Sequence, residues 1–197
     1  MQNLNLNLKS VILLVFLLPV LPGCALLLAG GVAAGVGTGV AMSQDRRTSG
    51  MFVEDESIES RSSARISEKL GSNVHVNVTS FNRNVLLTGE APSEAAKKEI
   101  ERLVTGVQNV RSVTNEIAVG EVSSYTSRSN DALITSKVKG RFVDAARFQA
   151  NHVKVVTEDS VVYLLGLVNK EEARSAVDTA RSTSGVRKVV KVFEYLN

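Results

Sequence analysis

Residues 85–89 read Val-Leu-Leu-Thr-Gly, and residues 162–166 read Val-Tyr-Leu-Leu-Gly, 77 positions further along the chain. The match extends in both directions from these two apolar segments. Self-similarity at a fixed offset indicates that one structural unit is present twice. The offset between the copies changes by one or two residues where loops are expected. The other matched pairs are Val76 with Val153, Val78 with Val155, Ile100 with Val177, Gly106 with Gly185, Asp55 with Asp131, Ile58 with Ile134, Arg65 with Arg141 and Ile66 with Phe142.

Each copy contains the same order of expected elements. Apolar residues at helical spacing predict helices, and alternating apolar residues predict strands. Ser93 is typical of a helix N-cap, and Asn169 with Glu172 three residues later forms a capping box. The order is α-β-β-α-β, with helices at about 55–70, 93–105, 131–146 and 170–182, polar turns at 82–84 and 158–160, and last strands at about 110–119 and 187–196.

The first residues have the pattern of a secretory signal. An apolar run from Val11 to Val20 follows a polar start and leads into Leu21-Pro22-Gly23-Cys24. A run of this length is too short to span a bilayer alone. The alternative is one long membrane helix over residues 11–42, kinked by proline, which the many glycines of that stretch disfavour.

Composition excludes several classes of protein. An apolar fraction of 44% with 22% charged residues excludes disordered and collagen-like chains. A net charge of +3 is too small to predict nucleic-acid binding. The single cysteine, Cys24, excludes internal disulfides and cysteine-cluster metal sites.

No motif predicts a catalytic, metal or cofactor site. His75 and His152 occupy matching positions, and neither has a cysteine, another histidine or paired carboxylates at ligand spacing in the sequence. We interpret both as solvent-facing strand residues. A G-x-S-x-G serine motif is absent, and the Gly30-Gly31 stretch lacks the strand and the Lys-Ser/Thr of a phosphate loop.

The repeated motifs resemble BON domains. The resemblance is carried by the Val-x-Leu-x-Gly segments at 85–89 and 162–166 and by the Gly-Val-x-x-Val segments that begin at Gly106 and Gly185. The stretch that ends at Cys24 resembles the lipobox of bacterial lipoproteins, which are cut before the cysteine and lipidated on it. Pro22 departs from the small residue usual in that motif.

A pair of BON domains behind a lipobox resembles the family of division- and outer-membrane-stress-associated lipid-binding lipoproteins. The resemblance implies a non-enzymatic protein that is anchored in the outer membrane through Cys24 and faces the periplasm. Ala25, in place of the aspartate that retains such proteins in the inner membrane, agrees with this location. The resemblance also implies that the second BON domain binds anionic phospholipid and that the protein supports outer-membrane integrity.

We therefore expect an α+β fold of two tandem small domains, each a three-stranded mixed sheet packed on two helices. Domains of this size bury little core, so packing of one on the other would stabilise both. The expected division is a lipoprotein signal peptide at 1–23, a lipidated Gly/Ala-rich tether at 24–54, BON domain 1 at 55–120, a linker at 121–129 and BON domain 2 at 130–197.

The two copies differ most in charge and in their first helix. Residues 55–120 contain 8 basic and 9 acidic residues, whereas residues 128–197 contain 12 basic and 8 acidic residues. At about 100° per residue, Leu133 and Val143 point away from the core stripe of the second helix. That stripe contains Ile134, Val138, Phe142 and Ala145, and the outward face also carries Ser136, Gly140 and Arg147, with Lys137 and Lys139 beside it.

An apolar strip with a basic border is typical of helices that contact an anionic membrane surface. The matching residues of the first copy are small or polar: Ser57, Ser60, Ala64 and Ser67. Two alternatives remain, namely that Leu133 and Val143 pack against the first domain, or that the face binds outer-membrane assembly proteins or a division-site complex. The sequence predicts that anionic phospholipid binds at Leu133, Ser136, Lys137, Lys139, Gly140, Val143 and Arg147.

Overall fold

The computed structural model describes residues 45–196. The predicted signal peptide, Cys24 and the tether up to residue 44 lie outside the described residues, so these assignments stay predictions. Within the described residues, no helix combines the length and the apolar character needed to cross a bilayer.

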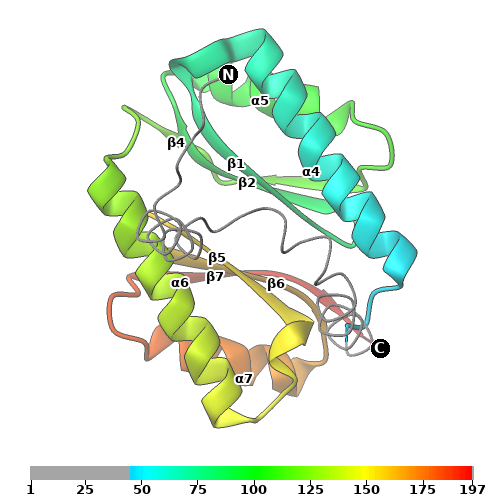
Figure 1. Cartoon of the computed structure of the whole chain (residues 1–197), viewed down its shortest axis with the longest axis vertical. Helices are drawn as coiled ribbons and strands as arrows, with labels where there is room; N and C mark the ends of the chain where they lie inside the picture. Colours follow the sequence, from blue (N-terminus) through cyan, green and yellow to red (C-terminus); the bar gives the residue numbers. More distant parts are fainter. Residues whose placement is uncertain (1–44, 197) are drawn as a thin grey trace, which may run out of the picture. The chain divides into compact units, whose positions relative to one another are not determined.

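Both repeats have the predicted order of elements (Figure 1). The first comprises helix α4 (Ser49–Leu70), the 3₁₀ turn η2 (Gly71–Asn73), strands β1 (His75–Phe81) and β2 (Asn84–Ala91), helix α5 (Glu94–Thr105), and strands β3 (Ser112–Asn115) and β4 (Ala118–Val119). The second comprises helix α6 (Tyr125–Ala145), the 3₁₀ turn η3 (Ala150–His152), strands β5 (Val153–Glu158) and β6 (Val161–Val168), helix α7 (Lys170–Arg181), and strand β7 (Lys188–Tyr195).

Each repeat forms a mixed sheet with its second strand at the centre. Strand β1 is antiparallel to β2, and both β3 and β4 are parallel to β2 and pair with successive parts of it. In the second repeat, β5 is antiparallel and β7 parallel to β6. The α+β fold with two mixed sheets is therefore confirmed, and the last strand of the first repeat is split into two short segments.

The first helix of each repeat begins six residues earlier than predicted. The hydroxyl oxygens of Thr48 and Ser124 accept the backbone N–H groups of Met51 and Ser127, and so cap α4 and α6. The added residues of α6 are mostly polar, whereas those of α4 include the consecutive apolar residues Met51, Phe52 and Val53. Neither stretch has the helical apolar period, which is the signal that the prediction used. The N-caps predicted at Ser93 and at Asn169 with Glu172 are confirmed.

The two helices of each repeat cover one face of its sheet. In the second repeat, Ile134, Val138 and Phe142 are buried against Val162 and Leu164 of β6. The predicted core stripe is correct for these three residues of α6. It is wrong for Ala145, which is exposed because α6 ends there.

The opposite faces of the two sheets pack on each other. One buried apolar cluster joins Phe81 and Leu86 of the first repeat to residues of β6 in the second. Polar contacts border it: the Asn77 amide donates to a Glu158 carboxylate oxygen at 2.8 Å. The residues that β6 contributes to this cluster are Val161, Tyr163 and Leu165.

Gly89 and Gly166 lie at close approaches between strands. A Cβ atom on Gly89 would lie 2.0 Å from the carbonyl oxygen of His75, and one on Gly166 would lie 2.4 Å from that of His152. Both glycines lie within β2 and β6, not at the ends of these strands. The close backbone contact therefore excludes a side chain at both positions.

Candidate lipid-binding site

Helix α6 carries large apolar side chains on the face turned away from the core. Leu133 is 60% exposed and Val143 is 66% exposed. The alternative that these two residues pack against the first repeat is wrong, because the repeats meet through their sheets. Burial of Ile134 and Phe142, which lie next to them in sequence, follows from the helical period.

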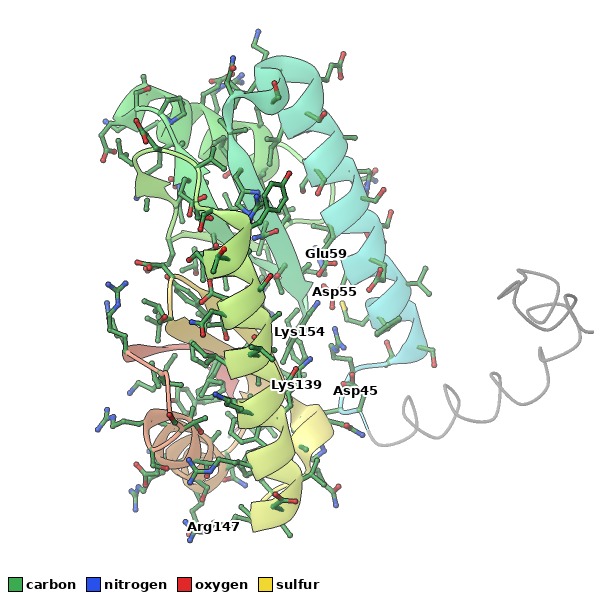
Figure 2. All side chains as sticks on the ribbon, turned by 60° about the vertical axis from the view of Figure 1, so that its left-hand side comes forward. Asp45, Asp55, Glu59, Lys139, Arg147 and Lys154 are labelled. Atoms are coloured by element: carbon green, nitrogen blue, oxygen red, sulfur yellow. The ribbon has the colours of Figure 1, made fainter. Side chains whose placement is uncertain are left out.

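Basic residues lie along the same helix and just beyond its C-terminal end. Lys137, Lys139 and Arg147 are exposed, and within residues 45–196 none of them forms an ion pair. Figure 2 places Lys139 partway along α6 and Arg147 at its C-terminal end. The face also includes the exposed acidic residue Asp144, which offsets part of the positive charge of the basic residues.

The middle of this face is nearly flat. The Ser136 hydroxyl donates to the carbonyl oxygen of Ala132 at 3.0 Å, so its hydrogen-bonding capacity is partly used within the helix. A Cβ atom on Gly140 would have no heavy atom within 4 Å. Packing within the described residues therefore does not require glycine at this position.

The corresponding face of the first repeat lacks these side chains. Ser60, Ala64 and Ser67 are exposed on α4, and they match Ser136, Gly140 and Val143 of α6. Among the described residues, the exposed large apolar side chains are Val53, Val119, Val122, Tyr125, Leu133, Val143, Tyr195 and Leu196.

Tyr125 is a further member of the α6 face that the sequence analysis missed. It is 83% exposed at the first residue of the helix, and the Arg128 guanidinium lies 4.3 Å from the centre of its ring. Val122, just before the helix, is also exposed. Both residues fall in the stretch that was predicted as a linker. The available signal was Ser124, a good N-cap residue.

The C-terminal end of α6 borders a pocket of about 520 Å³. Val143 and Arg147 line it together with Glu172 and Arg46. The Arg46 guanidinium donates to both carboxylate oxygens of Glu172, at 2.7 and 2.8 Å. These hydrogen bonds from Arg46 lower the pKa of the Glu172 carboxyl. The structure thus brings two of the predicted residues, Val143 and Arg147, to one pocket with both polar and apolar lining.

The interpretation of the two histidines as solvent-facing is wrong. His152 is buried beside Glu172, with 3.6 Å between its Nδ1 atom and a carboxylate oxygen. His75 is partly buried, and its Nε2 atom is inaccessible and has no hydrogen-bond partner. His75 is the first residue of β1, and His152 ends the 3₁₀ turn just before β5.

Comparison with known proteins agrees with this architecture. The BON domain family matches residues 54–121 and 130–197. The chain belongs to the BON-domain family. The outer membrane lipoprotein DolP of Haemophilus influenzae is 36% identical over 91% of this chain and 96% of its own length. By this relationship the BON-domain protein described here is an outer-membrane lipoprotein, as the sequence predicted.

Other relatives are more distant. The 21 kDa hemolysin of Actinobacillus pleuropneumoniae is 34% identical over 77% of this chain and 79% of its own length. Osmotically-inducible protein Y of Escherichia coli is 28% identical over 71% of this chain and 72% of its own length. Both relatives match more than two thirds of this chain.

Proposed function

We propose that this lipoprotein binds anionic phospholipid through the outward face of α6 and thereby supports outer-membrane integrity. The observation that carries the proposal is the exposure of Leu133 and Val143 beside lysines that form no ion pair within residues 45–196, on a helix whose opposite face completes the core. The function is a binding function that requires no catalysed reaction.

The two parts of the contact are individually weak. Full burial of an apolar side chain such as leucine contributes about 1.5–3 kcal/mol, and each basic residue near an anionic surface contributes about 1 kcal/mol. Anchoring at Cys24 would keep the domain next to the bilayer. The resulting effective concentration makes a weak contact sufficient, because the second binding event is intramolecular.

Arg147 and the adjoining pocket extend this contact. Guanidinium groups bind phosphate with two parallel hydrogen bonds, and Arg147 has no partner within residues 45–196. Arg46 lines the same pocket but is engaged by Glu172. We therefore assign the headgroup contact to Arg147, with Lys137 and Lys139 contributing less specific attraction.

Vesicle co-sedimentation tests the proposal. A chain that begins at Asp45 lacks the anchor, so the assay measures the weak contact of the folded part alone and needs a high lipid concentration. We expect it to bind vesicles that contain phosphatidylglycerol and to bind neutral phosphatidylcholine vesicles poorly. Leu133→Glu should abolish binding without lowering the melting temperature, because Leu133 lies outside the core.

The matched control is Ser57→Glu, which places the same charge at the matching position of the first repeat. This variant should bind vesicles as the wild type does. Binding of folded Leu133→Glu at the wild-type level would contradict the proposal. A different result would support the alternative, a protein-binding scaffold. In that case the wild-type chain binds no vesicles but binds outer-membrane assembly proteins, and Leu133→Glu abolishes that binding.

A further inference from the structure

The interface between the two sheets contains three potential metal ligands from both repeats. His75 of β1 lies directly opposite Glu90 of β2 in the antiparallel pair. Glu158, at the end of β5, comes from the second repeat. One ligand atom of each side chain lies within 4.8 Å of the others, although the three residues are far apart in sequence.

Two of these side chains have polar atoms that are buried without a partner. Glu90 and Glu158 are each only 8% exposed. The Oε2 atom of Glu90 and the Nε2 atom of His75 are inaccessible and accept or donate no hydrogen bond. A buried carboxylate oxygen without a partner is costly, so its presence at this point requires a physical reason.

No lysine or arginine of residues 45–196 compensates these carboxylates. Within residues 45–196, neither Glu90 nor Glu158 forms an ion pair with a lysine or arginine. Lys154, on the same strand as Glu158, pairs instead with Glu59 at 2.8 Å. Both residues are labelled in Figure 2. Burial and the neighbouring Glu90 raise the pKa of the Glu158 carboxyl.

We propose that His75, Glu90 and Glu158 form a divalent metal site, suited to Zn²⁺, that links the two repeats. An imidazole nitrogen with two carboxylates is a ligand set for zinc, whereas Mg²⁺ and Ca²⁺ prefer oxygen ligands alone. A tetrahedral zinc with bonds of about 2.0–2.2 Å places its ligand atoms about 3.4 Å apart. The three ligand atoms, which lie within 4.8 Å of one another, would have to move closer together on binding, and water would complete the coordination.

A neighbouring side chain already orients one ligand. The Asn77 amide donates to Oε2 of Glu158 at 2.8 Å, which leaves the other carboxylate oxygen for the metal. Hydrogen bonds of this kind from outside the ligand set fix the geometry of metal sites. The site therefore requires both repeats, and a bound ion would strengthen their contact. This inference is independent of the α6 face.

Zinc titration of the full-length protein in detergent tests the site. After treatment with a chelator, we expect one Zn²⁺ per chain to bind in calorimetry and to raise the melting temperature. Mg²⁺ at the same concentration should do neither. Loss of a group that only supports a metal ligand weakens metal binding by about 10–100-fold, so His75→Ala should weaken it at least tenfold.

The matched control is His152→Ala, which removes the histidine at the equivalent position of the second repeat and should retain wild-type affinity. Glu158→Gln provides a variant that folds, because it removes a buried charge while keeping the size of the side chain. It too should lose zinc binding. The inference is overturned if the chelated protein binds no zinc, or if His75→Ala and Glu158→Gln bind zinc as tightly as His152→Ala.

Discussion

The carboxylate of Asp131, on α6, accepts the backbone N–H of Ser160 at 2.8 Å and so ties the helix to the hairpin turn between β5 and β6. Its second oxygen accepts the backbone N–H of Asp159 at 3.0 Å. Asp159 and Ser160 both have positive φ, as a two-residue hairpin turn of type I′ requires. Asp55 binds the equivalent turn of the first repeat in the same way.

Removal of this carboxylate should destabilise the second repeat. Asp131→Ala leaves two turn N–H groups without their partner, and we expect a loss of about 1–3 kcal/mol in the free energy of unfolding. Urea unfolding measures this loss. Asp144→Ala, at an exposed position of the same helix, is the control and should change stability by less than about 0.5 kcal/mol. Equal stabilities of the two variants would contradict the role of Asp131.

A side chain at Gly166 should also destabilise the fold. Gly166→Val places its Cβ atom 2.4 Å from the carbonyl oxygen of His152, so β5 and β6 must separate. Overpacking of this kind costs about 1–3 kcal/mol, which a lower melting temperature would reveal. Unchanged stability together with lost vesicle binding would instead give Gly166 a direct role in function.

The repeat and its element order are predictable because apolar periodicity encodes them locally. Contact between the two sheets is harder to recognise. The uninterrupted apolar run from Val161 to Leu165 is typical of a strand buried on both faces. In β2 the face that contacts the other sheet includes the polar residues Thr88 and Glu90. An uninterrupted apolar run therefore marks β6 as buried on both faces but does not mark β2. The repeats were therefore expected to pack together, but without a defined surface.

The candidate lipid site was predictable where helical geometry alone decides exposure, as at Leu133 and Val143. Tyr125 was missed because the first turns of α6 are polar and have no period. The cluster of His75, Glu90 and Glu158 was missed for another reason: a hairpin register and the contact between repeats bring these residues together. Spacing within a single sequence contains neither piece of information.

Replacement of Ala146 by glycine should stabilise the protein. Ala146 follows α6 in the left-handed conformation, with φ of 47°. That conformation costs a residue with a Cβ atom about 1–2 kcal/mol, of which the entropy of glycine in the unfolded chain offsets part. We expect a net gain of about 0.5–1 kcal/mol. Ala145→Gly, one residue earlier within the helix, should lower stability by a similar amount.

The contact between Arg46 and Glu172 should make stability depend on pH. Because Arg46 lowers the pKa of Glu172, its contribution is present above the ordinary glutamate pKa of about 4.3 and is lost as the pH falls. Arg46→Ala should therefore be less stable than the wild type at pH 7, and the difference should shrink at pH 3. Urea unfolding at both pH values measures it.

The control for this prediction is Arg102→Ala. Arg102 also pairs with a glutamate, Glu99, and its hydrogen bond likewise lowers the pKa of that carboxyl. The pair lies at the surface, where solvent screens the charges, so little change in stability is expected at either pH. If the loss of stability depends on pH equally in the two variants, the contact of Arg46 with Glu172 contributes no more than a surface ion pair.

Gly140 distinguishes a membrane from a protein surface as the binding partner of α6. Gly140→Ala adds one methyl group in open space, and the better helix propensity of alanine should raise the free energy of unfolding by about 0.5–1 kcal/mol. A fluid bilayer adapts to one added methyl group, so vesicle binding should be unchanged or slightly stronger. A protein partner packed closely on the bare helix backbone does not adapt, because such interfaces are as dense as protein interiors.

Weaker vesicle binding by this more stable variant would contradict contact with fluid lipid. Weaker binding to a protein partner, with vesicle binding absent in the wild type, would instead identify α6 as a docking face for that protein.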